Sequence, residues 1–283
     1  MKTWHDHALL LDVKRHSESA CIASVLSKHH GLYTGFVHGG RSKKRMSTWQ
    51  AGTLLTLTWR ARLDSHMGFF THTPEYGAPT PPQLTLYNHP QALACFASAL
   101  TFARQHAQPR QKESALYHSL CALRRQLHAS HPSQNDSMRV AQRYACWEYD
   151  FLAMMGYGLD LRDCASGTPC HARDLIYVSP KSGHAVSADK GRAWARKLLP
   201  LPPFLCHYAH HRTLSPQPSR QDIFDALNMS GYFLEKHLCH RHPLPYQRRL
   251  ILFDIARCPQ PKSASPSSTR DNQEISEHAH KIT

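Results

Sequence analysis

Apolar residues in the first 80 positions come in short stretches, some alternating with polar residues, and glycine-containing turns separate several of them. The five stretches are Ala8–Val13, Ala20–Leu26, Leu32–Val37, Leu54–Trp59 and Met67–Phe70. Short strands separated by glycine-containing turns are typical of a small barrel or sandwich. We therefore predict a five-stranded β domain over residues 1–80.

The apolar period becomes helical after a proline-rich stretch at residues 73–82, which we interpret as a linker. In three successive segments an apolar residue then recurs every three or four positions, which gives each segment one apolar helical face. The clearest case is Val140, Tyr144, Trp147, Phe151 and Met154. Ser219, followed three residues later by Asp222, is a start signal for a further helix. The sequence thus predicts an α+β protein whose second, mainly helical domain covers residues 83–256.

Two segments lack such regularity. Residues 159–191 contain one short strand candidate, Leu175–Val178, and we predict an irregular insertion there. In residues 257–283 proline, serine, lysine and aspartate dominate with few apolar residues, which is typical of a disordered tail.

Charge narrows the range of partners. Lysine and arginine number 34 against 20 aspartates and glutamates, which gives a formal charge of +14. Such an excess favours a polyanion, either nucleic acid or an anionic membrane surface. The apolar runs are far shorter than the ~20 residues of a spanning helix, and the first residues do not resemble a signal peptide. We therefore expect a cytoplasmic protein that binds nucleic acid.

The positive charge concentrates between Lys28 and Arg62, where no acidic residue occurs. The candidate DNA-binding residues are Lys28, Arg41, Lys43, Lys44, Arg45, Arg60 and Arg62. Four of them follow Gly39-Gly40 on a predicted loop, where cations can meet successive phosphates and release counterions. Trp49 and Trp59 are alternatives as stacking faces for bases, although tryptophan is more often part of a core. A solvated basic hairpin without a ligand is the alternative interpretation of the cluster.

Several motifs occur in an order that is known from one protein family. The most specific is Gly35-Phe36-Val37-His38-Gly39-Gly40-Arg41-Ser42-Lys43-Lys44. It is followed by Trp147-Glu148-Tyr149, Gly156-Tyr157-Gly158-Leu159, Tyr177-Val178-Ser179-Pro180 and Tyr232–Leu238. Over roughly residues 1–255 the chain resembles the RecO family of bacterial DNA repair proteins.

The resemblance implies an amino-terminal OB-fold barrel, and a helical domain whose insertion is zinc-finger-like. It also implies a recombination mediator that does no bond chemistry. Proteins of this family bind single- and double-stranded DNA, anneal complementary strands, bind the carboxy-terminal tail of single-stranded DNA-binding protein (SSB), and act with RecR to load RecA onto SSB-coated DNA. We therefore expect DNA, RecR and SSB as partners, a functional link to RecA, and a location at the nucleoid.

A metal or other cofactor is not expected. Some relatives in the family carry a four-cysteine zinc site in the region that matches residues 159–191, but this chain has only Cys164 and Cys170 there. A structural zinc site needs four well-placed ligands. The 23 histidines make close pairs inevitable, yet no spacing matches a zinc module. We predict an insertion that lacks its cysteines and its metal.

Catalytic signatures such as GxSxG, a P-loop or HExxH are missing from the sequence. Glu148 and Asp150 stand two residues apart on a predicted helix, so they point to different faces and do not form an acid–base pair. We predict that the chain is not an enzyme and that Glu148 has a structural role. The alternatives are an RNA-binding accessory protein that uses an OB-like barrel, and a zinc-dependent nucleic-acid enzyme.

A second acid-free stretch runs from Lys190 to Gln221. The candidates for binding the SSB tail or another partner are Arg192, Arg196 and Lys197 in this stretch and Arg139 and Arg143 on the third predicted helix. An acidic tail with an apolar end requires arginine or lysine beside an apolar pocket. The stretch also contains Trp194 and could instead extend the DNA path, or be an ordinary solvated surface.

Overall fold

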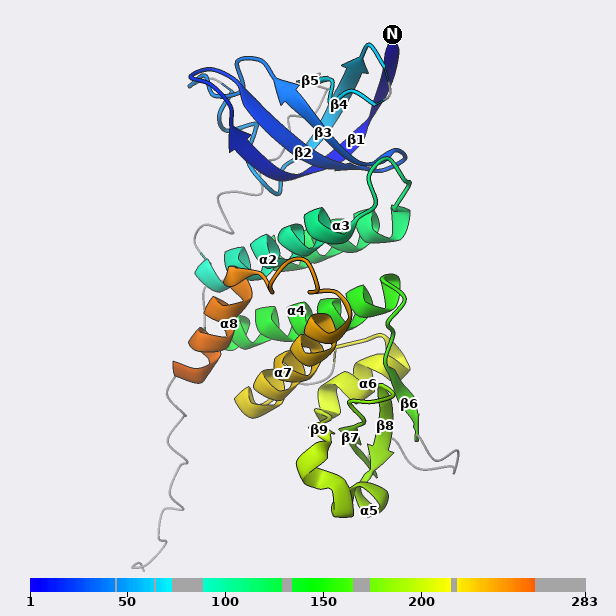
Figure 1. Ribbon diagram of the computed structural model, residues 1–283. Helices are drawn as coiled ribbons and strands as arrows, with labels where there is room; N and C mark the ends of the chain where they lie inside the picture. Colours follow the sequence, from blue (N-terminus) through cyan, green and yellow to red (C-terminus); the bar gives the residue numbers. More distant parts are fainter. Residues whose placement is uncertain are drawn as a thin grey trace, which may run out of the picture.

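The computed structural model describes residues 1–43, 45–63, 65–72, 89–128, 134–164, 174–214 and 218–257 (Figure 1). The strands are β1 (Lys2–Arg15), β2 (Cys21–Ser27), β3 (Gly31–Val37), β4 (Leu54–Ala61), β5 (Phe69–His72), β6 (Asp160–Cys164), β7 (Leu175–Val178), β8 (His184–Ser187) and β9 (Leu199–Pro200). The helices are α2 (Pro90–His106), α3 (Ser114–His128), α4 (Gln134–Met154), α5 (Ala188–Gly191), the 3₁₀ helix η2 (Arg192–Lys197), α6 (Pro203–His211), α7 (Arg220–His237) and α8 (Tyr246–Arg257). The predicted α+β class is confirmed. The predicted linker and residues 258–283 of the predicted tail lie outside the described residues.

The first five strands form a closed sheet in the order β1-β2-β3-β5-β4, called the barrel below. β1 closes it, because the first half of this long strand pairs with β4 and the second half with β2. A register shift between Leu10 and Asp12 marks the change of partner, as an extra residue bends a strand. The predicted five-stranded sheet is thus confirmed.

Apolar side chains from alternate strand positions fill the barrel. Trp59 is 0% exposed and Trp49 is 6% exposed, and both belong to one cluster with Leu10 and Phe70. The indole Nε1 of Trp59 donates a hydrogen bond to the Met67 carbonyl at 2.9 Å, so its polar atom is satisfied inside the protein. The alternative in which these two tryptophans offer stacking faces to bases is therefore wrong, because burial removes both rings from any ligand.

The barrel packs directly on the helices rather than being joined to them by a linker alone. Leu9, Leu11 and Leu26 point away from the barrel interior and belong to the helical core. The buried Arg124 of α3 donates from Nε to the carbonyl of Gly52 at 3.2 Å. The two parts therefore form one continuous packed structure, with α2 and α3 against the barrel (Figure 1).

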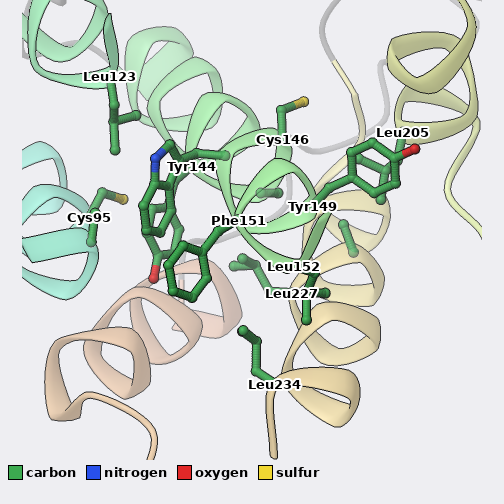
Figure 2. Packing of buried hydrophobic residues seen from close by; sticks show 14 of the residues in the cluster. Cys95, Leu123, Tyr144, Cys146, Tyr149, Phe151, Leu152, Leu205, Leu227 and Leu234 are labelled. Atoms are coloured by element: carbon green, nitrogen blue, oxygen red, sulfur yellow. The ribbon is translucent and has the colours of Figure 1, made fainter. Parts of the chain in front are cut away.

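α2, α3 and α4 are the three helices that the apolar periodicity predicts. α4 lies at the centre of the helical core, where Tyr144 and Phe151 face α2 and Leu152 faces α7 (Figure 2). The Tyr144 hydroxyl lies 2.6 Å from the hydroxyl of Ser98 on α2, which satisfies both buried groups. α7 begins at the predicted capping box of Ser219 and Asp222.

The insertion is more regular than predicted. β6, β8, β7 and β9 form a four-stranded sheet in that order, followed in space by α5 and η2. The irregular structure expected for residues 159–191 is thus wrong beyond Leu175–Val178, because strands of two to five residues are too short to show a period. The zinc-finger-like character is not confirmed. Cys164 is buried in β6, and Cys170 lies outside the described residues.

Candidate nucleic-acid interface

The basic loop between β3 and β4 depends on two glycines. Gly39 has a φ of +66°, a left-handed conformation that other residues rarely adopt. A Cβ on Gly40 would lie 2.7 Å from Cys21 Sγ and 2.8 Å from a methyl group of Val37. Both are core residues of the barrel, so the backbone of the loop can lie close against the barrel wall only with glycine at this position.

The loop presents its cations at the surface of the barrel. Arg41 is half-buried and its amide donates to the carbonyl of Ser19 in the β1–β2 turn at 3.1 Å. Lys43 and Arg45 are exposed, and Arg45 donates from Nη1 to the carbonyl of His38 at 3.3 Å. Lys44 lies outside the described residues. Of the described members of the predicted cluster, Lys43 and Arg45 are thus exposed and Arg41 is half-buried, and backbone contacts hold the loop at its base.

Lys28 is not part of this surface. It follows β2, at the end of that strand opposite Cys21, and its carbonyl accepts a hydrogen bond from Ser114 of α3 at 3.5 Å. Seven residues of a strand span about 20 Å at ~3.3 Å per residue. The loop and Lys28 are therefore separated by the length of β2. The two lie in the same acid-free stretch of the sequence, but the fold places them at opposite ends of this strand.

Arg60 and Arg62 lie on a different strand from the loop. Arg60 is an exposed residue of β4, and in the sheet it pairs with Phe69 of β5. Arg62 follows the end of β4 and is also exposed. Arg60 is thus connected through the sheet to β5, the strand that also pairs with β3 at the start of the loop.

A row of outward-facing residues crosses all five strands. The pairs are Lys14 with Ile22, Ile22 with Phe36, Phe36 with Phe69, and Phe69 with Arg60. Paired residues of neighbouring strands point to the same face of a sheet. Phe36 and Phe69 are half-buried and lie outside the barrel core. The outer row therefore has two adjacent aromatic rings, with Arg60 next to Phe69 and with Ile22 between Phe36 and Lys14.

Two exposed histidines complete the row. The ring of His16 lies 5.0 Å from that of Phe36 in an edge-on contact, and the ring of His38 lies 6.1 Å from that of Phe69. His38 is also the residue whose carbonyl binds Arg45, so the aromatic row and the basic loop are neighbours. The sequence prediction missed Phe36 and Phe69, although their outward positions next to the buried Val37 and Phe70 follow from strand alternation.

The five partner candidates lie on two separate surfaces. Arg139 and Arg143 are half-buried on α4, where Arg139 donates to the side-chain oxygen of Gln142 at 3.4 Å and Arg143 to the carbonyl of Gln126 at 2.7 Å. Arg192, Arg196 and Lys197 are exposed residues of η2. Figure 1 shows α5, which runs directly into η2, at the end of the molecule away from the barrel, with α4 between them.

Arg143 lines a pocket of about 180 Å³ between α3, α4 and α6. Its walls include Leu123, Arg143, Trp147, Tyr208, Arg212 and Leu214. Asp150 accepts from the Tyr208 hydroxyl at 2.6 Å and from Arg212 at 2.5 Å. Burial, together with Asp150, raises the pKa of Tyr208, so the phenol keeps its proton and remains a donor. The lining of the pocket thus combines apolar side chains with two arginines and the carboxylate of Asp150, which is paired with Arg212.

In the described part of the chain no group of three or more histidine, cysteine, aspartate or glutamate side chains is placed to hold a metal ion. Within the same residues no helix combines the length and the apolar character needed to cross a bilayer.

Both halves of the chain match models of one protein family. "Recombination protein O N terminal" matches residues 1–74 and "Recombination protein O C terminal" matches residues 88–244. The DNA repair protein RecO of Rhodospirillum rubrum is 35% identical over 241 residues, which are 84% of this chain and 89% of that protein. The DNA repair protein RecO of a Ruegeria species is 36% identical over 260 residues, 90% of this chain and 98% of that protein.

These matches, on a chain that joins a five-stranded sheet to a helical region, define a protein of DNA repair and recombination. The chain belongs to the RecO family. The resemblance noted in the sequence is thereby confirmed.

Proposed function

We propose that the chain is a recombination mediator that binds single- and double-stranded DNA, anneals complementary strands, and acts with RecR to load RecA onto SSB-coated DNA. Residues 1–80 serve as an OB-fold domain for nucleic acid, and residues 83–256 carry the partner surfaces. No bond is made or broken and no cofactor is required, and the work is done at the nucleoid in the cytoplasm. Membership of the RecO family supports this role.

The observation that carries the proposal is the basic loop beside the row of Phe36 and Phe69. Phosphates lie on the outside of both single strands and duplexes, so Arg41, Lys43 and Arg45 can bind either form. Aromatic rings accept unpaired bases through their faces. A base held by its face keeps its hydrogen-bonding edge free, and a strand bound in this way remains able to pair with its complement.

We further propose that the SSB tail binds in the pocket between α3, α4 and α6. Trp147 and Leu123 offer apolar contact for the end of the tail, and Arg143 and Arg212 offer guanidinium groups for its carboxylates. This proposal selects Arg143 from the five partner candidates, since Arg143 is the one among them that lines this pocket. Arg139 lies one helical turn away from Arg143 on the same helix.

A peptide with the sequence of the SSB tail tests this pocket directly. Binding of the labelled peptide to Arg143→Ala is expected to be at least tenfold weaker, since charge-assisted hydrogen bonds contribute ~1.5–3 kcal/mol. Arg241→Ala, which removes an exposed arginine after α7, is the matched control and should bind normally. Equal binding by both variants would remove the tail from this pocket.

The proposed function as a whole is tested by comparing labelled single-stranded DNA, duplex DNA and a folded RNA over a salt series. We expect both DNA forms to bind at least as tightly as the RNA, with affinities that fall steeply with salt. A clear preference for the folded RNA would instead support the RNA-binding accessory protein.

A further inference from the structure

η2 presents a tryptophan to solvent. None of its six residues is buried, and Trp194 is 58% exposed. Three of the other four tryptophans, Trp49, Trp59 and Trp147, are at most 6% exposed. The indole of Trp194 therefore contributes little to the packing of the protein, and its exposure points to a role at the surface.

The exposed indole belongs to a basic segment of the chain. The segment Lys190–Lys197 has the sequence Lys-Gly-Arg-Ala-Trp-Ala-Arg-Lys, with four cations and no acidic residue. In a 3₁₀ helix the side chains at positions i and i+3 eclipse, which places Lys197 over Trp194, and its Nζ lies 5.3 Å from the ring centroid. Arg192 and Arg196 are exposed residues of the same short helix, and the period of three residues per turn puts them on its other two faces.

We propose that η2 is a second binding site for single-stranded nucleic acid, with Trp194 stacking on a base and Lys197, Arg196 and Arg192 meeting the adjacent phosphates. A flat aromatic face with cations on several sides is the arrangement that serves unpaired, sequence-independent binding. The choice of a nucleic acid over an acidic peptide rests on the shape of the segment. An apolar peptide end needs a pocket, whereas η2 is a projecting turn without a buried residue.

The position of η2 would allow this site to hold a different strand from the one on the barrel. The barrel and α5, which leads into η2, lie at opposite ends of the molecule, with the helices between them (Figure 1). A single protein molecule would then hold one nucleic-acid strand on the barrel and a second nucleic-acid strand on η2. This two-strand role rests on the proposed function, while the binding of nucleic acid by η2 does not depend on the barrel.

Intrinsic fluorescence and a labelled oligothymidine test the site. Trp194→Ala is compared with Phe253→Ala, which removes a 52% exposed aromatic residue from α8 beside Asp254. Both changes are made in the full chain and in the variant with Arg41, Lys43, Lys44 and Arg45 replaced by alanine. We expect Trp194→Ala to weaken oligothymidine binding at least about fivefold in the four-alanine background, and Phe253→Ala to change nothing. In wild type, oligothymidine should quench an exposed tryptophan signal that Trp194→Phe lacks.

The possible results separate this inference from the proposed function. If the four alanines leave binding unchanged but Trp194→Ala weakens it, the barrel site is wrong and η2 is supported. If the four alanines weaken binding and Trp194→Ala and Phe253→Ala behave alike, the η2 site is overturned. The η2 site is also overturned if Trp194→Ala no longer binds a labelled acidic peptide with an apolar end but still binds oligothymidine. η2 would then be a contact surface for a protein.

Discussion

Arg248 of α8 and Glu148 of α4, 100 residues apart in the chain, form a buried ion pair with two hydrogen bonds. Arg248 Nε lies 2.8 Å from Glu148 Oε1, and Arg248 Nη2 lies 3.1 Å from Oε2. The two side chains are 4% and 0% exposed. Ser230 of α7 also donates to the carboxylate, and Arg248 donates to the carbonyl of Leu227. The pair thus ties α4, α7 and α8 together.

Breaking this pair should strongly destabilise the protein. Burial alone would lower the pKa of Arg248, but Glu148 raises it, so the arginine is charged and needs its partner. We expect Glu148→Gln to lower the free energy of unfolding in urea at pH 7 by ~3–5 kcal/mol, because a buried charge then loses its counter-charge. Glu18→Gln, at an exposed residue of the β1–β2 turn, is the control. A loss below ~1 kcal/mol for Glu148→Gln would contradict the role assigned to the pair.

The basic loop should set part of the salt dependence of DNA binding. Replacing Arg41, Lys43, Lys44 and Arg45 by alanine removes up to four phosphate contacts. For single-stranded DNA this should reduce the slope of log affinity against log salt by up to ~3, at ~0.7 per contact. Fluorescence anisotropy over a salt series measures the slope. An unchanged slope would exclude the loop from the DNA site.

Lys28 offers a matched comparison within the same sequence window. Because it lies at the far end of β2 from the loop, Lys28→Ala should leave both the slope and the affinity close to those of the wild type. If Lys28→Ala alone reduced the slope by as much as the loop variant, the DNA path would have to run along β2 rather than across the loop.

The aromatic row should distinguish single strands from duplexes. Phe36→Ala with Phe69→Ala removes both rings from the outer face, while the loop stays in place. We expect single-stranded DNA to bind ~1–3 kcal/mol less tightly for each base that loses its stacking partner, with duplex binding unchanged. Equal losses for both forms, with an unchanged melting temperature, would show that the row does not act on bases.

Acid should weaken the barrel through Asp6. This buried carboxylate accepts hydrogen bonds from the amide of His29 at 2.7 Å, from the amide of His7 at 2.9 Å, and from the Ser27 hydroxyl. Burial alone would raise the pKa of Asp6, but the hydrogen bonds from Ser27, His29 and His7 lower it. The stability it contributes is therefore present above the unfolded pKa of ~3.9 and is lost as the pH falls through the folded value.

Urea unfolding at several pH values checks this assignment. Asp6→Asn should be clearly less stable than the wild type at pH 7, and the difference should shrink below about pH 4 as the wild-type carboxyl takes up its proton. Asp12→Asn replaces a half-exposed carboxylate on the same strand and serves as the control. A difference between Asp6→Asn and wild type that stays constant down to pH 3 would contradict the linkage.

The sequence predicted the elements with a sustained period and missed those that depend on distant pairing. Val140, Tyr144 and Phe151 repeat over several turns, and α4 follows from them. β6 and β8, in contrast, pair in parallel across about twenty residues of chain, and neither strand is long enough to show alternation. The strand pairing of the insertion is therefore visible in the structure but not in the sequence pattern.

The same limit applies to the site. The described loop cations Arg41, Lys43 and Arg45 stand together in the sequence and belong to one loop in the structure, because Gly39 and Gly40 fold the loop locally. Phe36, Phe69 and Arg60 come from three strands and meet through the register of a closed sheet, which no local pattern encodes. Lys28 shows the converse, since it is close to the loop in sequence and distant from it across β2.

The central claim, that the chain mediates recombination on SSB-coated DNA, is tested most directly by the rate at which complementary SSB-coated strands anneal. The account predicts that the protein accelerates this annealing, and that deletion of the SSB tail abolishes the acceleration while naked strands still anneal faster in its presence. If the protein accelerates annealing of neither coated nor naked strands, the account is contradicted.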